Sequence, residues 1–261
     1  MLARSNAKVK NIYKPDIISV NTDADSEDVA IIMEKYDIVA LPVVDTIGRL
    51  MGRITIDDVV DVIKEEAEKD YQMISGITED VEPSDNVFVL TRARIPWLFI
   101  GLIGGILGAN VIGIFELEIL KDPKLVIFLP LIAAMAGNVG VQSSSIVVQG
   151  LANKTIDFDS TWKKLMKEFS IAFIIGITFS ILILTYNLLF THSIQLTLTV
   201  STALFTVILF ASIFGTFIPL ILNRFKIDPA VATGPFITTM NDILGMFIYL
   251  GLSRVLYGLF A

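Results

Sequence analysis

The sequence predicts a small α/β domain followed by an all-α membrane domain of five transmembrane helices, which is a mixed fold class. Two observations support this prediction. Hydrophobic residue types make up 54% of the 261 residues, and the mean hydropathy is +0.71, which is too apolar for a soluble protein that must cover its surface with polar groups. From residue 95 onward, five long segments carry no charge or a single one, whereas residues 1–74 mix short apolar runs with charged turns.

The first 74 residues carry the signals of three strands and two helices. Short apolar runs bounded by turn residues predict strands at 16–20, 41–44 and 50–54. Ser26 is a helix N-cap residue followed by acidic side chains, so a helix is expected from there to about Tyr36. Thr55 begins a second helix that reaches about Ile74. A domain this small buries little apolar surface, so we expect it to dock onto a partner.

Residues 75–94 form a polar, acidic connector, which we expect to end in a short amphipathic helix at 86–94. Residues 95–261 form the membrane domain. Its five segments each exceed the roughly 20 residues that cross the hydrocarbon core of a bilayer. They lie at residues 95–115, 125–152, 169–190, 194–222 and 229–253. Buried helices of a large soluble protein can also be this apolar, but five in succession leave too little polar sequence to cover them.

Lysine and arginine in the loops predict the orientation in the membrane. The loops on one side carry Arg92, Arg94, Lys154, Lys163, Lys164, Lys167, Arg224 and Lys226. On the other side one loop has Lys121 and Lys124, the loop around His192 has none, and Arg254 ends the last span. Basic loops stay in the cytoplasm, so the N-terminus is expected inside and Ala261 outside.

Composition limits the chemistry that the chain can perform. The net charge is −7, and residues 1–94 hold 19 acidic and 11 basic side chains, which disfavours nucleic acid as a partner. The chain has no cysteine and one histidine, so a bound metal must use oxygen ligands. The N-terminus lacks the apolar core of a secretory signal. No nucleophile is paired with a base, so we do not expect an enzyme.

Asp242 is an acidic residue near the middle of the fifth apolar segment. An ionisable group at that depth costs at least about 3 kcal/mol and normally faces a bundle interior or an aqueous path. Thr238 lies one turn earlier, and Pro235 is expected to free a backbone carbonyl, so this helix can offer a carboxylate, a hydroxyl and carbonyl oxygens. These ligands suit Mg²⁺ and Ca²⁺. The alternative is a protonated Asp242 that is hydrogen-bonded between helices.

Two patterns of small and polar residues could line a path or pack helices together. Residues 137–145 form a polar island of Gly, Asn, Gln and Ser within the second segment, after Pro130. Such residues can simply bond neighbouring helices, but glycines beside Asn138 also expose carbonyls, which suits a pore wall. In the first segment Gly101, Gly104, Gly105 and Gly108 have the spacing of close helix packing, which is the favoured interpretation there.

The helix after Thr55 has a strongly acidic face. Its acids at three- and four-residue spacing are Asp58, Asp61, Glu65 and Glu68, with Glu66 and Asp70 beside them. A solvated surface is the usual explanation of such a run. Like charges at this spacing repel, however, so a second acidic surface placed against this one would need divalent cations between them. That arrangement would act as a Mg²⁺ sensor coupled to the membrane domain.

These motifs together resemble a known family. The run 41–45, 48–52 and 55–58 (LPVVD, GRLMG, TIDD) resembles a cystathionine-β-synthase (CBS) domain. The runs 136–143 (AGNVGVQS) and 228–242, from Asp-Pro-Ala to Thr-Thr-Met-Asn-Asp, resemble the MgtE family of magnesium channels. The resemblance covers nearly the whole chain, and the joint order of the CBS domain and both membrane motifs is strongly specific.

The resemblance implies a homodimeric Mg²⁺ channel embedded in the lipid of the plasma (inner) membrane, with residues 95–261 as its pore domain and 86–94 as a plug. It implies pore ligands at Asp242, the main chain of Thr238, Gly137 and Asn138. It implies cytoplasmic sensor positions at Asp58, Asp61, Glu66 and Asp70. CBS domains of this kind can also hold ATP, for which the implied contacts are Thr55 and Asp58.

The sequence departs from the family at several points. Family members normally have an acidic helical N-terminal domain and two CBS domains, so this chain is interpreted as truncated or unusually short, with weak Mg²⁺ gating or a bias toward the open state. Gly234, Lys69 and Gln149 replace an Asn, an acid and an Arg found in relatives. Two alternatives stay open: a cation-coupled secondary transporter that uses Asp242, and a membrane-anchored CBS sensor without transport.

Overall fold

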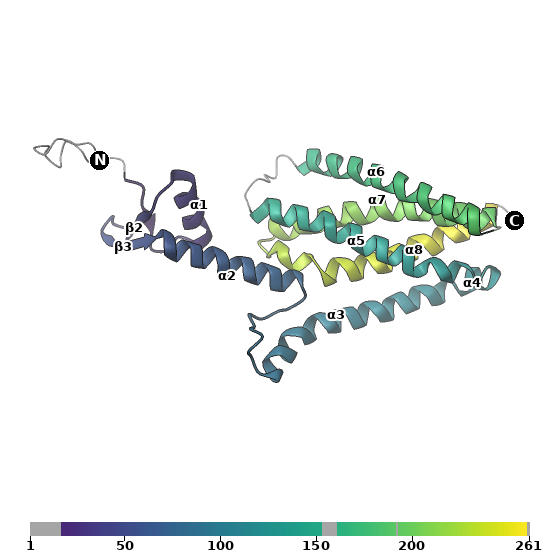
Figure 1. Ribbon diagram of the computed structural model, residues 1–261, viewed down its shortest axis with the longest axis horizontal. Coiled ribbons are helices and arrows are strands. Elements are labelled where there is room, and N and C mark those ends of the chain that lie inside the picture. Colours follow the sequence, from purple (N-terminus) through teal and green to yellow (C-terminus); the bar gives the residue numbers. More distant parts are fainter. Residues whose placement is uncertain (1–16, 153–160, 192, 260–261) are drawn as a thin grey trace, which may run out of the picture. The chain divides into compact units, whose positions relative to one another are not determined.

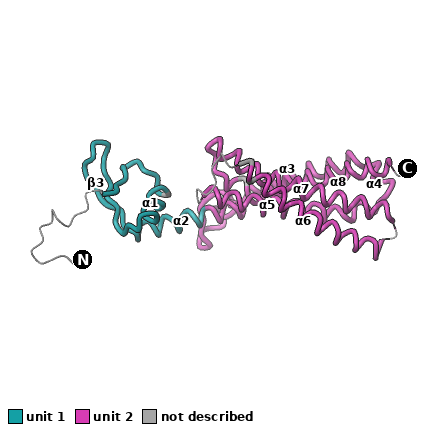
Figure 2. The backbone as a smooth tube through the Cα atoms, turned by 90° about the horizontal axis from the view of Figure 1, so that it is seen from above, with its two compact units in different colours: residues 1–69 teal, residues 70–261 magenta. Residues whose placement is uncertain are grey.

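The computed structural model describes residues 17–152, 161–191 and 193–259 (Figure 1). Asp16 of the first predicted strand, Lys154, His192 and Ala261 lie outside the described residues. The chain divides into two compact units, residues 1–69 and 70–261, which Figure 2 distinguishes by colour. Each unit is described by itself.

The described residues of unit 1 form the three strands and two helices that the sequence predicts. The elements are β1 Val20–Asn21, α1 Ser26–Tyr36, β2 Ala40–Val44, β3 Leu50–Thr55 and α2 Ile56–Ile74, whose last turn enters unit 2. The strands form one sheet in the order β1-β2-β3, with β1 parallel and β3 antiparallel to β2. The small apolar core consists of Val20, Val29, Ala30, Met33, Leu41 and Val59. The α/β prediction is confirmed, although the first strand is shorter than 16–20.

Unit 2 is helical. Its elements are α3 Val87–Ile114, α4 Glu116–Lys121, α5 Leu125–Ala152, α6 Thr161–Phe190, α7 Ile194–Arg224, the 3₁₀ helix η3 Pro229–Ala232 and α8 Pro235–Leu259. Among the described residues, five helices (α3, α5, α6, α7 and α8) are long and apolar enough to cross a membrane. α7 is the central helix and packs on α5, α6 and α8, while α3 packs on α8 (Figure 1). The predicted five-span architecture is confirmed.

The structure corrects the expected boundary at residue 94. Residues 86–94 were expected as a separate short helix, but α3 runs without interruption from Val87 to Ile114, with Pro96 inside it. Asn86 caps this helix, since its Oδ1 accepts the Val89 N–H at 3.0 Å. Proline has no N–H and loosens the helix around it, but it does not end this one. Near this proline, the Ala93 carbonyl accepts both the N–H and the hydroxyl of Thr78 from the connector, each at 3.0 Å.

A second correction concerns Pro235. The sequence places this proline inside the fifth span, where it would free a carbonyl, but the structure makes it the first residue of α8. Gly234 before it has φ +66°, a left-handed conformation that stops a helix from extending toward the N-terminus. Asp242 therefore lies in the third turn of α8, closer to the N-terminal end of its helix than predicted.

The C-terminal half of α8 is held by the segment that runs from α4 to the first residue of α5. Arg254 Nε lies 2.8 Å from Oε1 of the buried Glu118 in α4. Tyr257 donates to Asp122 at 2.7 Å, and the buried Tyr249 donates to the Leu125 carbonyl at 3.0 Å. These contacts, together with the apolar core shared by α5, α7 and α8, fix the helix that carries Asp242.

Candidate functional site

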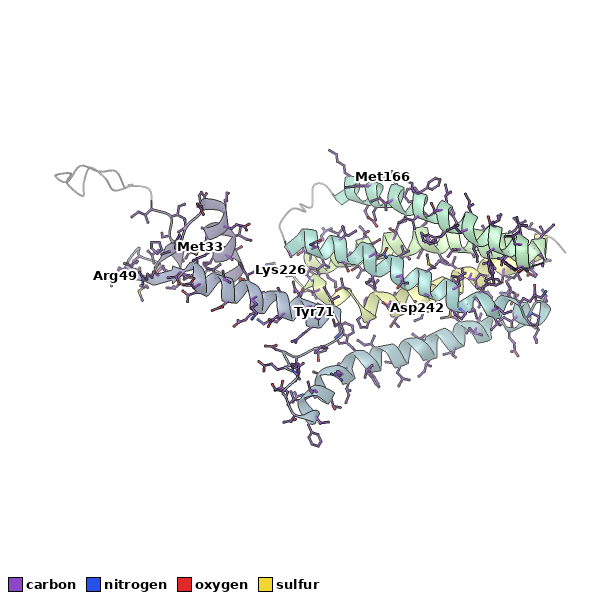
Figure 3. The ribbon with its side chains drawn as sticks, viewed as in Figure 1. Met33, Arg49, Tyr71, Met166, Lys226 and Asp242 are labelled. Carbon is purple, nitrogen blue, oxygen red and sulfur yellow. The ribbon has the colours of Figure 1, made fainter. Side chains whose placement is uncertain are left out.

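Asp242 lies on α8 (labelled in Figure 3), and its Oδ1 lies against Gly137 of α5. It is half-buried, and its Oδ1 is buried without a hydrogen-bond partner among the described residues. A Cβ placed on Gly137 would lie 2.8 Å from Asp242 Oδ1 and 3.0 Å from Thr238 Cγ2. The structure therefore brings together three of the four predicted pore positions, and only glycine fits at 137 without moving its neighbours.

Thr238 uses its hydroxyl hydrogen within its own helix. The hydroxyl donates to the Gly234 carbonyl at 2.9 Å, and the Thr238 N–H reaches the same carbonyl at 3.0 Å. The hydroxyl oxygen keeps lone pairs that can accept a further hydrogen bond or contact a cation. The Thr238 side chain is therefore oriented before any ligand arrives.

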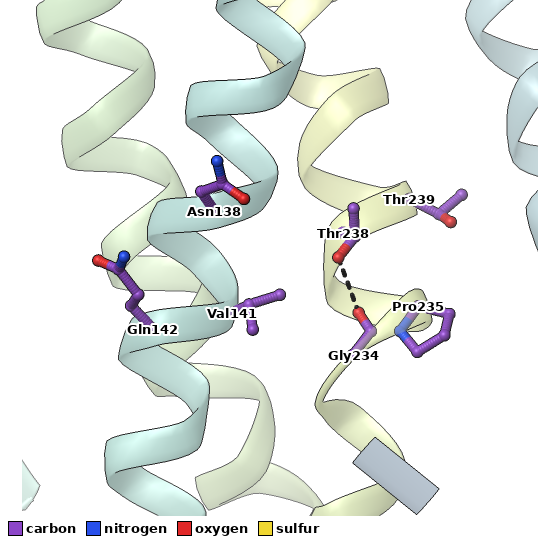
Figure 4. A pocket seen from close by; sticks show the side chains of 7 residues that line it. All are labelled: Asn138, Val141, Gln142, Gly234, Pro235, Thr238 and Thr239. Atoms are coloured by element: carbon purple, nitrogen blue, oxygen red, sulfur yellow. Dashed lines mark hydrogen bonds between the residues drawn. The ribbon is translucent and has the colours of Figure 1, made fainter. Parts of the chain in front are cut away.

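A cavity of about 680 Å³ lies beside this cluster (Figure 4). It is lined by Asn138, Val141 and Gln142 of α5 and by Gly234, Pro235, Thr238 and Thr239. The polar groups in this wall are amides, hydroxyls and backbone, and none carries a charge. Asn138 thus lines the same cavity as Thr238.

Asp242 lines a second cavity of about 400 Å³, next to the glycines of α3. Gly104 and Gly108 pack against Thr239 and Met246 of α8, since a Cβ at either position would collide with those side chains. A Cβ at Gly101 or Gly105 would have no described atom within 4 Å. The packing interpretation therefore holds for Gly104 and Gly108 and not, among the described residues, for Gly101 and Gly105. The predicted ligands therefore line two different cavities: Thr238 and Asn138 line the larger one, and Asp242 lines the smaller one.

Two polar residues in unit 2 were missed from the sequence. Asn241 is 2% exposed, its Nδ2 has no hydrogen-bond partner within the described part of the chain, and it packs against Gly140. The sequence signal that could have identified Asn241 is its position directly before Asp242 in the chain. Glu168 of α6 binds serines of α5 and α7. The predicted span began one residue later because charged residues were taken as its boundary, so Glu168 was assigned to a loop.

Asp58, a predicted sensor residue, is the third residue of α2 and bonds back to Thr55, the residue before the helix. Its Oδ2 accepts the Thr55 hydroxyl at 2.6 Å and the Thr55 N–H at 2.9 Å, a capping-box arrangement. These hydrogen bonds, with a smaller attraction from Arg53, hold the pKa of Asp58 below its ordinary value. Thr55 and Asp58, the implied ATP contacts, are thus already bonded to each other.

The other predicted sensor acids lie along α2 without converging. Glu66 pairs with Lys69 at 2.7 Å, while Asp61 lies nearer the start of the helix and Asp70 begins unit 2. Across the described residues, no group of three or more His, Cys, Asp or Glu side chains could hold a metal ion. A cation site on this face would therefore need ligands beyond these.

Comparison with known proteins gives two matched families. A family model described as "Divalent cation transporter", MgtE, matches residues 129–252, and the CBS domain model matches residues 9–65. The chain is 33% identical over 253 residues to the magnesium transporter MgtE of Bacillus subtilis, covering 97% of this chain and 56% of that protein. It is 31% identical over 258 residues to the Thermus thermophilus protein of the same name, covering 98% and 57%. The chain thus spans little more than half the length of these curated relatives.

Proposed function

Because the chain belongs to the MgtE family of divalent cation transporters, we propose that it transports Mg²⁺ across the membrane with Asp242 as the carboxylate that contacts the ion. The observation that carries this proposal is the buried Oδ1 of Asp242, which has no hydrogen-bond partner among the described residues. A carboxylate oxygen at membrane depth costs at least about 3 kcal/mol unless something neutralises or solvates it. A hard divalent cation supplies that partner.

The larger cavity suits an ion that keeps its water. Mg²⁺ loses water reluctantly, and six waters at liquid density occupy roughly 180 Å³. The larger cavity, lined by Thr238 one turn before Asp242, measures about 680 Å³, and the cavity that Asp242 itself lines measures about 400 Å³, so a hydrated ion fits into either. The amides of Asn138 and Gln142 and the hydroxyl of Thr238 can bond those waters without binding the ion so tightly that it stays.

The proposed assembly is a homodimeric channel. One Asp242 per chain is a thin basis for selectivity, and a two-fold axis would place two such carboxylates around one path. In this proposal the protein lies in the plasma (inner) membrane, with the N-terminus in the cytoplasm and the C-terminus outside. The pore ligands are Asp242, the main chain of Thr238, Gly137 and Asn138.

Cytoplasmic Mg²⁺ would regulate the path through the acidic face of α2. In the proposed sensor, ions bridge the sensor acids to a second acidic surface; these acids are Asp58, Asp61, Glu66 and Asp70. Within unit 2, the Ile74 carbonyl at the end of α2 abuts Gly234, and a Cβ on Gly76 would lie 2.8 Å from Pro235 Cγ. A shift of the end of α2 would therefore reach the first turn of α8. ATP, if the CBS domain binds it, would have to share Asp58 with the helix cap.

The test is Mg²⁺ uptake into proteoliposomes that contain the full chain, followed with a Mg²⁺-sensitive dye. Asp242→Asn keeps the size of the side chain and removes its charge, so uptake should fall by at least about tenfold. Glu116→Gln removes an acid from the loop between α3 and α5 as a control and should leave uptake unchanged. Undiminished uptake by the Asp242→Asn protein would refute the proposal. Uptake that requires a proton or sodium gradient would instead support the coupled transporter.

A further inference from the structure

Glu168 joins three helices through a triangle of oxygen atoms. Its Oε1 lies 2.5 Å from the Ser143 hydroxyl of α5 and 2.9 Å from the Ser212 hydroxyl of α7, and the two hydroxyls are 3.0 Å apart. Both serines are buried, with 3% and 1% of their surfaces exposed. Glu168 itself is half-buried near the start of α6.

This contact reaches across the bundle rather than along it. α6 packs mainly along α7, and α5 packs mainly along α7 and α8. The bond from Glu168 to Ser143 therefore links α6 to a helix that is not one of its main packing neighbours. Hydrogen bonds to an ionised acceptor are the stronger kind, and placing this charge among apolar helices is costly unless it is bonded. An apolar residue would fill the position more cheaply, so packing alone does not account for a glutamate here.

Ser143 and the cavity lie on different sides of α5. Each residue of an α-helix turns about 100° around the axis, so Gln142 lies about 100° and Asn138 about 140° from Ser143 in one direction. Gly137 and Gly140, which face Asp242 and Asn241 of α8, lie about 120° and 60° away in the other direction. Contacts on both sides of the helix thus determine how far it is rotated.

We propose that Glu168 is a positioning residue for the ion path: by holding Ser143 and Ser212 it fixes the rotation of α5 that turns Asn138 and Gln142 toward the cavity. Side-chain ends lie roughly 5.5 Å from a helix axis, so a rotation of about 20° moves them by roughly 2 Å. Binding groups generally need to be held within about 0.5 Å. Loss of the Glu168 contacts is therefore enough to misplace the amides that line the cavity.

The link to transport rests on the proposed function, so the first readout does not use transport. The chain has no cysteine, which allows one cysteine to be introduced and its reaction with a charged methanethiosulfonate reagent to be timed in lipid nanodiscs. Gln142→Cys reports on the cavity wall. Val139→Cys reports on the buried side of the same helix, because Val139 is 6% exposed.

In the Gln142→Cys protein, Glu168→Ala should change the reaction rate by at least about tenfold, because it removes hydrogen bonds to a charged group. Glu168→Gln should change the rate by less than about threefold, since the amide oxygen still accepts from both serines. The double change Ser143→Ala with Ser212→Ala should match Glu168→Ala, and it decides the question if that variant does not fold. Ser170→Ala is the matched control, because its hydroxyl bonds the Met166 carbonyl within α6.

An unchanged rate in both Glu168→Ala and the double serine variant would overturn the proposal. Equal gains in reactivity at positions 139 and 142 would also overturn it, because they would show general loosening rather than rotation. So would a Glu168→Gln effect as large as that of Glu168→Ala, which would assign the role to the charge itself. In proteoliposomes, the variants that change the reaction rate of the cysteine at position 142 should also change the Mg²⁺ concentration at which uptake is half-maximal. An absence of uptake in the unaltered protein would refute the proposed function and leave the cysteine result standing.

Discussion

Gly137→Ala tests whether the close approach of α5 to Asp242 matters for transport. The new Cβ would lie 2.8 Å from Asp242 Oδ1. An ordinary carbon–oxygen contact is about 3.3 Å, so the carboxylate must move by roughly 0.5 Å. A misplacement of 1 Å can cost about a hundredfold in rate, and half of that distance suggests roughly a tenfold loss of Mg²⁺ uptake. Alanine gains about 1 kcal/mol in helix propensity, while overpacking costs about 1–3 kcal/mol. The net loss of stability is therefore at most about 2 kcal/mol.

The assay is Mg²⁺ uptake into proteoliposomes, normalised to the amount of reconstituted protein, with thermal melting in detergent measured in parallel. Gly113→Ala in α3 is the matched control, since a Cβ there would meet no described atom within 4 Å. It should melt at the same or a slightly higher temperature and transport normally. If Gly137→Ala transported Mg²⁺ at the rate of the unaltered protein, the close α5–α8 approach would not form part of the ion path.

Two further predictions concern the ends of helices. Gly234→Ala should lower the melting temperature in detergent, because Gly234 has φ +66° and a Cβ there would collide with the Ile74 carbonyl. Gly234→Asn tolerates the backbone angle but not the collision, so its melting temperature should lie between those of the unaltered protein and Gly234→Ala. Equal melting temperatures for these three proteins would refute this prediction. Asp58→Asn should speed hydrogen exchange at the start of α2 at neutral pH, whereas Asp57→Asn should not. Because the Thr55 hydrogen bonds lower the pKa of Asp58, its stabilisation is present above the ordinary aspartate pKa and is lost as the pH falls through the lowered one. In acid, the exchange rates of the unaltered protein and of the Asp58→Asn variant should therefore converge. A difference that persists there would refute the role of the Asp58 carboxylate at the start of α2.

The elements of unit 1 were predictable because their boundaries depend on local chemistry. α1 begins at Ser26 and α2 begins directly after Thr55, and in both cases acids follow in the first turn, as the sequence indicates. The spans were predictable for a different reason, namely that a long uncharged segment has few alternatives to a membrane helix. In both cases the signal lies within the segment itself, so one sequence is enough.

The two prolines show where local rules fail. The sequence analysis placed a helix boundary between residues 94 and 95, just before Pro96, and helical continuity through Pro235. The structure has the reverse, because α3 is held through Pro96 by capping at Asn86 and by the Thr78 contacts, whereas α8 can only start after the left-handed Gly234. The deciding contacts come from other segments, and the identity of the proline does not reveal them.

The role of Glu168 could not be predicted from the sequence for the same physical reason. Its partners are 25 and 44 residues away along the chain, on two other helices, and no spacing rule connects them. Asp242 could be found because an acid at membrane depth is anomalous by itself. Glu168 lies at the start of a span among lysines, where an acid is unremarkable until the buried serines are placed beside it.

In the two proposals, Asp242 and Glu168 act on α5 from different sides, since Gly137 and Ser143 lie about 120° apart around the helix, and together they give one account of the site. On one side Gly137 lets α5 approach Asp242 closely; on the other, Ser143 ties α5 to Glu168. Between these contacts, Asn138 and Gln142 face the larger cavity. If only the first contact mattered, α5 could roll about the glycine surface, because glycine offers no side chain to resist rotation. In the proposed arrangement the second contact removes that freedom, so the polar wall needs both carboxylates, although of these two only Asp242 would contact the ion.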